Sequence, residues 1–340
     1  MFVTYPHDDQ LVYKRLLPKL TLDIEVTKSK SGRLYHPEIL ERKFMGGEYH
    51  YRFIASGQML HIGNYSASAG IEFEEDPKAC KLEDMLFNVK EVGEYLFVFS
   101  ANQKVTVLNR KDWNVKVKVF DSLFIWRACD KSNENYYNCS RAVQVLSDNI
   151  FFTSPARKLV RIDASTSNLE VTEMASEVQD FFFDGSMSYL TCLTPKGMVK
   201  YGDMQTDLTK IKGTEVYWIC MVASSKYLLV SGWWKECSEN YLVMLARSDL
   251  SIRGEFTALE SQMPIYMLSH LSYKKMDLVL CIRYWECAEL VALTKKGLIS
   301  VLTKHKICKS ASENQYGITA IHDGWILGGE CLKKIKIVEK

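Results

Sequence analysis

The sequence predicts an all-β fold in which seven four-stranded sheets stand in a closed ring, a seven-bladed β-propeller. Three observations lead to this prediction. Apolar runs of strand length recur throughout the 340 residues, with short turns between them. The most apolar runs are spaced at 38 to 54 residues, close to the length of one four-stranded blade. An alternating segment near the start of the chain can supply a strand that the last repeat lacks.

The runs that mark the seven repeats are almost continuously apolar, which is typical of strands buried between neighbouring sheets. By residue number they are 51–57, 94–100, 149–155, 188–194, 226–232, 276–282 and 324–329. Each is accompanied by shorter runs, as in the second repeat, where LFNVKEV, EYLFVFS, KVTVLNR and VKVKVFD follow one another. In the fourth repeat we expect DLTKIKG to be the last strand. Turn residues such as Asp323-Gly324 separate first and second strands.

The two ends of the chain are expected to pair with each other. Residues 316–340 read as three short strands, and the unpaired edge of so small a sheet invites aggregation. Leu20–Val26 (LTLDIEV) alternates apolar and polar residues, so it can become the fourth strand beside 335–338. This pairing divides the chain into an N-terminal extension, 1–19, and the propeller, 20–340.

Composition narrows the functional classes. A net charge of +2 does not favour nucleic acid or anionic membrane as the main partner. No apolar run is long enough to span a bilayer, and residues 1–15 do not resemble a signal peptide. The ten cysteines contain no CxxC pair, so we expect reduced thiols, no metal site and no cofactor in a cytoplasmic or nuclear protein.

The last repeat carries a recognisable pattern, D-G-x-x-L followed by I-x-I, at Asp323, Gly324, Leu327, Ile335 and Ile337. With this pattern and the sevenfold spacing, residues 20–340 resemble the WD-repeat β-propeller family. The Gly-His and Trp-Asp dipeptides that name the family are absent from every repeat. In that family, the connections that enter each blade and the loops between second and third strands share one face, which is often the binding face. The resemblance implies such a face here.

Two adjacent repeats carry similar aromatic loops after their second strands. Repeat five reads GWWKEC and repeat six reads RYWEC, so that Trp234 aligns with Trp285. We therefore expect Trp233, Trp234, Tyr284 and Trp285 to lie close together as a protein-binding surface, because aromatic clusters are typical interface hot spots. The alternative is that these rings pack between blades or cover the central channel.

An insertion before repeat three, residues 129–141, is expected on the same face. Its Tyr136 and Tyr137 are candidates to extend the protein-binding surface. The alternative is a solvated polar loop.

No catalytic motif is present: the sequence contains no G-x-S-x-G, H-E-x-x-H, phosphate-binding loop or dinucleotide fingerprint. The prediction is a non-catalytic scaffold that binds other proteins within a multi-subunit complex. Two alternatives remain open at this point: a propeller enzyme or small-ligand binder that uses the central channel, and an adaptor associated with RNA or the ribosome. Nucleic acid is possible through the basic edge strands but is not favoured.

Overall fold

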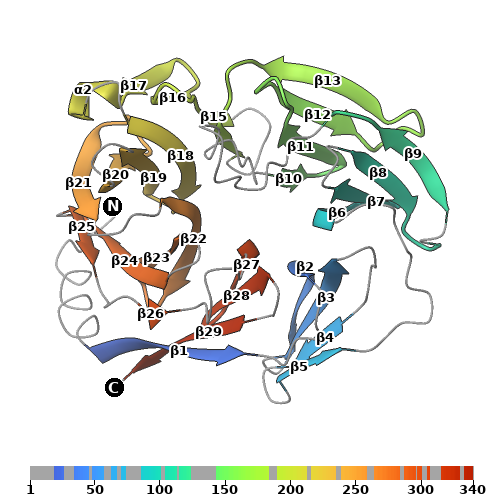
Figure 1. The fold of residues 1–340 in the computed structure, drawn as a ribbon, viewed down its shortest axis with the longest axis horizontal. Helices are drawn as coiled ribbons and strands as arrows, with labels where there is room; N and C mark the ends of the chain where they lie inside the picture. The colour runs from blue at the N-terminus through green and yellow to red at the C-terminus, as the bar shows by residue number, and fades with distance from the viewer. Residues whose placement is uncertain are drawn as a thin grey trace, which may run out of the picture.

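The computed structural model describes the strands of the chain and many of its turns. The described residues are 19–26, 34–45, 48–56, 63–66, 70–73, 86–100, 104–112, 115–123, 143–183, 190–212, 216–234, 239–258, 264–283, 287–295, 297–300, 305–306, 315–329 and 333–339. Their strands form seven sheets that stand side by side around a central axis (Figure 1). The prediction of an all-β propeller is confirmed.

Each sheet is one blade, and its strands are antiparallel. Blade one contains β2 (Leu34–Met45), β3 (Glu48–Ser56), β4 (Gly63–Ser66) and β5 (Gly70–Phe73). Blade two contains β6 (Leu86–Val92), β7 (Tyr95–Ser100), β8 (Val105–Asn109) and β9 (Lys116–Phe120). Blade three contains β10 (Val143–Leu146), β11 (Asn149–Thr153), β12 (Leu159–Asp163) and β13 (Glu170–Ala175).

The remaining blades repeat this plan. Blade four contains β14 (Asp180–Phe183), β15 (Leu190–Leu193), β16 (Met198–Tyr201) and β17 (Met204–Asp207). Blade five contains β18 (Val216–Ala223), β19 (Tyr227–Trp234), β20 (Glu239–Ala246) and β21 (Ile252–Ala258). Blade six contains β22 (Ile265–Tyr273), β23 (Met276–Arg283), β24 (Cys287–Thr294) and β25 (Gly297–Ser300), with β26 (His305–Lys306) also paired to β24.

Blade seven joins the two ends of the chain. It contains β27 (Gln315–Ile321), β28 (Gly324–Gly329), β29 (Lys333–Glu339) and, on its outer side, β1 (Leu20–Val26). β1 runs antiparallel to β29 from Leu20 opposite Glu339 to Val26 opposite Lys333. Leu20 and Leu22 are buried in the same core as Trp325 and Ile335, so one face of β1 is held by apolar packing. The predicted pairing of the chain ends is confirmed (Figure 1).

The second strand of a blade is among its deeply buried strands, as its apolar run predicts. The side chains of β11 are buried after the first residue, and those of β19 are buried except at the two ends. Outer strands differ: the residues of β9 and β13 are almost all exposed. The core therefore lies between neighbouring blades, where their middle strands face each other.

The last strand of blade four differs from the prediction. Instead of extending through DLTKIKG, the chain forms β17 and then a short helix, α2 (Thr209–Lys212). The Asp207 carboxylate accepts hydrogen bonds from the Thr209 backbone N–H and hydroxyl group, at 3.0 and 2.6 Å. This side-chain cap satisfies groups at the start of the helix and ends the strand.

Four innermost strands carry a β-bulge at a comparable place. The register shifts past one residue in each of β6, β18, β22 and β27, and the extra residues are Phe87, Ile219, Tyr266 and Tyr316. A bulge increases local twist and leaves backbone groups outside the regular ladder. Those groups need other partners, and some of these partners come from the neighbouring blade.

Candidate functional site

The aromatic residues predicted as a binding surface begin at the end of β19. Trp233 and Trp234 are the last residues of this strand, and successive side chains of a strand point to opposite faces. Trp233 is 7% exposed and belongs to a core that contains Ile219 and Tyr266. Trp234 is half-buried and packs against the other core of blade five, around Trp218. The two rings therefore diverge, and Trp234 is the more accessible of the two.

Trp234 is held by packing rather than by hydrogen bonding. Its indole nitrogen is buried and has no hydrogen-bond partner among the residues that the structure describes. An unpaired buried donor is a net cost to folding, so only the apolar ring secures this side chain.

Tyr217 is a neighbour that the sequence did not single out. It lies on β18 directly opposite Trp233, and its side chain is 45% exposed. Val216 and Trp218, on either side of it, are buried on the face that Trp234 shares, so the alternation along β18 places Tyr217 on the other face, beside Trp233. This alternation is the sequence signal that could have identified it. We refer to Tyr217, Trp233 and Trp234 as the aromatic end of blade five.

Polar contacts fix the aromatic end of blade five against blade six. Asn240, opposite Trp233, is buried, and its Oδ1 accepts a hydrogen bond of 2.8 Å from the Ile265 backbone N–H. The Ser231 hydroxyl donates to the Ile265 carbonyl at 3.2 Å. Ile265 adjoins the bulge at Tyr266, so the two side chains pair backbone groups that the distorted ladder would leave open.

Blade six has a buried ion pair where its own aromatic loop begins. Arg283 Nη2 and Glu289 Oε2 are 2.8 Å apart, and both side chains are at most 1% exposed. Removing one partner of such a pair leaves a buried charge uncompensated, which is strongly destabilising. Arg283 is the last residue of β23, so the residue from which the loop departs is fixed.

The other predicted site residues are not placed by the structure. Tyr284 and Trp285, and likewise Tyr136 and Tyr137, lie outside the described residues. Their grouping with Trp233 and Trp234 remains a prediction.

An enzyme or ligand binder that uses the central channel would need titratable groups with unusual pKa values on the innermost strands. Asp180, on β14, is a group of this kind. Burial raises the pKa of Asp180 to about 7. Its Oδ2 accepts from the Met221 N–H of blade five and its Oδ1 from the Phe181 N–H, both at 2.8 Å. Both oxygens therefore have backbone partners, and one joins blade four to blade five. Within the described residues, no group of three or more His, Cys, Asp and Glu side chains could hold a metal ion.

Asp180 predicts a pH-dependent stability. Its pKa is higher in the folded than in the unfolded state, so the folded state binds more protons between these values and stability falls as pH rises. Between pH 6 and pH 8 we expect a loss of about 1.4 kcal/mol from this group, to be measured by urea unfolding. Asp180→Asn should lower stability at pH 6 by leaving an N–H unpaired and should remove this slope. An unchanged slope in the variant would assign it to another group.

The joint between blades three and four is also polar. Gln144 on β10 donates through Nε2 to the Phe181 carbonyl at 3.0 Å and accepts through Oε1 from the Phe183 N–H at 3.1 Å. The amide of Gln144 thus pairs with the free side of β14 as a peptide group of an added strand would.

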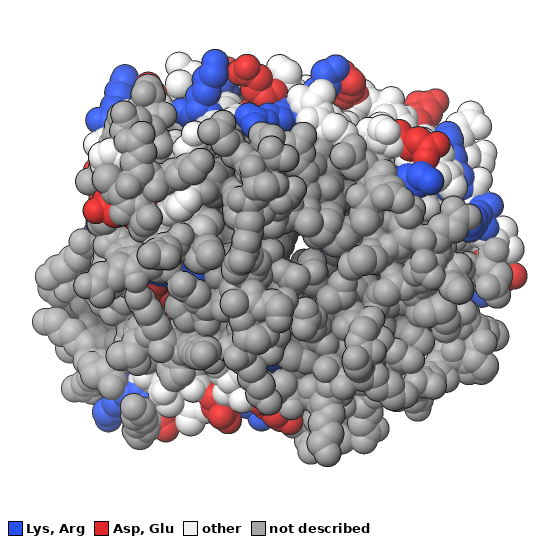
Figure 2. Space-filling view, in the orientation of Figure 1, with Lys and Arg blue, Asp and Glu red and all other residues white. Residues whose placement is uncertain are grey.

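Figure 2 shows charged residues along the described rim of the ring. Lys and Arg residues are interspersed there with Asp and Glu residues. No helix in the described part of the chain is long and apolar enough to cross a bilayer.

Comparisons with known proteins agree with the fold. The N-terminal domain of Nup159 superposes with a TM-score of 0.62 at 10% identity, over 95% of this chain and 96% of that one. The Cps50 (Swd1) β-propeller domain of Myceliophthora thermophila gives 0.59 at 11% identity, over 93% and 100% of the two chains. The Nup133 β-propeller domain of Vanderwaltozyma polyspora gives 0.59 at 9% identity, over 92% and 100%. No family model and no curated protein sequence matches. The chain is a β-propeller.

Proposed function

We propose that this propeller is a non-catalytic scaffold, a WD-repeat-like subunit that binds other proteins within a larger assembly in the cytoplasm or nucleus. The observation that carries the proposal is the aromatic end of blade five, where Tyr217 is 45% exposed and Trp234 is half-buried on a rigid strand. Aromatic side chains of this kind supply much of the binding energy of protein interfaces.

Two further observations support a scaffold. Gln144 and Asp180, two polar residues of the innermost strands, form hydrogen bonds with backbone groups of the neighbouring blade. Among similar structures, one belongs to a complex of Dbp5 with Nup159 and Gle1 and another to the Mitotic Checkpoint Complex, with TM-scores of 0.62 and 0.53. A rigid ring that offers loops and strand ends to several partners fits such assemblies.

Trp234 provides the test. Affinity purification of the full chain, with quantitative mass spectrometry, should show at least one partner that is reduced about tenfold by Trp234→Ala together with Tyr217→Ala, because hot-spot truncation costs about 2 kcal/mol or more. Trp234→Phe should retain more of that partner than Trp234→Ala, since it keeps a six-membered aromatic ring and loses the smaller ring of the indole, whose donor has no partner within the described residues.

The control lies on the outer strand of blade three. Val171 is 42% exposed there, so Val171→Ala removes exposed apolar surface away from the aromatic end and should leave the partner set unchanged. Identical partners for the wild-type and the double-alanine chains, with unchanged melting temperatures, would exclude the aromatic end of blade five as the binding surface.

A further inference from the structure

The turns at the other end of the blades are unevenly charged. These turns join the first strand to the second and the third strand to the fourth. In blade five they lie at the end where β19 begins, at Tyr227, away from Trp234. In blades five and six the described turn residues include five cationic side chains and one acidic side chain. They are Lys226, Arg247, Lys274, Lys275 and Lys295, and the acid is Asp249.

Blades two to four show the opposite balance at the same end. Their described turn residues include four acidic and two cationic side chains. They are Glu94, Asp112, Asp148 and Asp203, with Arg110 and Lys111. Arg110 is also ion-paired with Glu91, so its charge is partly neutralised. Among the described turns of blades two to six, the charge therefore changes from mainly acidic in blades two to four to mainly basic in blades five and six.

Blade six presents its lysines on tight turns. Lys274 and Lys275 form the two-residue turn between β22 and β23, closed by Tyr273 opposite Met276. Both have positive φ, 46° and 66°, which asparagine and glycine adopt at lower cost than lysine. Lys274 is ion-paired with Glu339 of blade seven, while Lys275 is exposed and its side chain can extend from the tip. Lys295 follows β24 at the same end of the blade.

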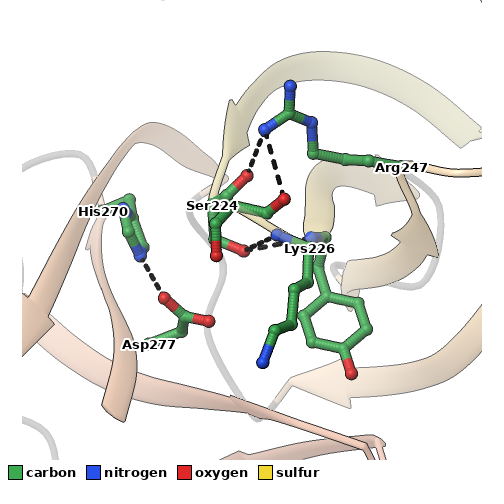
Figure 3. A network of polar contacts seen from close by, with 7 residues as sticks. Ser224, Lys226, Arg247, His270 and Asp277 are labelled. Atoms are coloured by element: carbon green, nitrogen blue, oxygen red, sulfur yellow. Dashed lines mark hydrogen bonds and ion pairs between the residues drawn. The ribbon is translucent and has the colours of Figure 1, made fainter. Parts of the chain in front are cut away.

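Blade five supplies the adjoining cations (Figure 3). Arg247 donates through Nη1 to the Ser224 carbonyl at 2.7 Å, and its guanidinium lies 5.6 Å from the Phe182 ring centroid. The Ser224 hydroxyl accepts from the Lys226 and Tyr227 N–H groups, which fixes the turn that carries Lys226. β18 packs beside β22, and at the base of the lysine turn His270 Nε2 lies 2.9 Å from Asp277 Oδ1. The cations thus stand on ordered turns.

We propose that the turns of blades five and six form a cationic docking surface for an acidic segment of a partner protein. Four cations on neighbouring turns, with Lys274 partly neutralised by Glu339 beside them, attract a segment rich in Asp and Glu, and fixed turns reduce the entropy lost on binding. A nucleic acid suits the surface less well, because Asp249 and Asp277 interrupt it and would oppose a continuous line of phosphates. This surface is distinct from the aromatic end of blade five and lies at the opposite end of β19.

Fluorescence anisotropy with a labelled glutamate-rich peptide tests the proposal on the full chain. At low salt we expect saturable binding that weakens as salt rises. Lys275→Glu with Lys295→Glu should weaken it at least tenfold. The matched control is Lys111→Glu, the same reversal on an exposed turn of blade two, which should change binding less than twofold. Trp234→Ala should leave it unchanged, so a failure of the aromatic surface and a failure of this one are distinguishable.

Several results would overturn the proposal. One is the absence of saturable peptide binding by the wild-type chain. Another is an equal effect of Lys111→Glu, which would indicate attraction to net charge rather than to this surface. Tighter binding of a single-stranded oligonucleotide with the same number of charges, lost in the double variant, would assign the surface to nucleic acid instead. Thermal melting of each variant verifies that it is folded, and a double variant that melts early is replaced by Lys275→Gln with Lys295→Gln.

Discussion

Replacing Leu22 with aspartate is expected to remove a large part of the free energy that keeps the protein folded. Leu22 is 6% exposed on β1 and packs in the core with Trp325 and Ile335 of blade seven. The substitution loses the burial of an apolar side chain, worth about 2 kcal/mol, and places a carboxylate in an apolar core, which costs at least as much again. We expect a loss of about 4 kcal/mol or more, measured as the midpoint of urea unfolding.

We call the pairing of β1 with β29, which closes blade seven, the latch. Thr21→Asp is the matched control for its loss. It introduces the same side chain one residue earlier, on the half-buried face of β1 opposite the exposed Val338. We expect a loss below about 1 kcal/mol, as for most substitutions away from a core. If Leu22→Asp were tolerated equally well, β1 would pair with β29 without closing the core. Limited proteolysis then shows whether blade seven opens before the other blades.

The latch was predictable because its signal is local and periodic. The alternation of Leu20, Leu22 and Ile24 with polar residues marks a strand with one buried face, and residues 316–340 require such a partner. The same reasoning located the second strands. Their runs are continuously apolar, whereas a strand with one exposed face would alternate apolar and polar residues. Asp323-Gly324 was placed correctly at a turn, since His322 and Asp323 connect β27 to β28.

The directions of the aromatic side chains were not predictable in the same way. The bulge at Ile219 changes the face of the sheet to which the following side chains of β18 point. No pattern in the sequence indicates this bulge. Trp233 and Trp234 look alike in the sequence, but one faces a core shared with blade six and the other a core shared with blade four. Contacts between blades, such as Asn240 with Ile265, depend on residues that are far apart along the chain.

Gly197 is the second position at which a single substitution should have a large effect. It lies in the turn between β15 and β16 with φ +83°, and a Cβ atom there would lie 2.4 Å from Trp218 Nε1. Trp218 is 1% exposed, so its ring has little room to move. Gly197→Ala therefore combines a left-handed backbone cost of about 1 kcal/mol with overpacking of about 2 kcal/mol. We expect a total loss of about 3 kcal/mol, measured by urea unfolding.

Gly202→Ala separates these two contributions. Gly202 has φ +56°, and a Cβ atom added there would meet no other atom within 4 Å, so alanine should cost only the backbone contribution of about 1 kcal/mol. Trp218→Leu offers the complementary test, because a smaller side chain relieves the contact with the methyl group that Gly197→Ala introduces. The double variant should then be more stable than the sum of the single losses predicts, by about 1 kcal/mol. Strict additivity would mean that Gly197 is required for its conformation alone and that the packing of blade four against blade five does not depend on it.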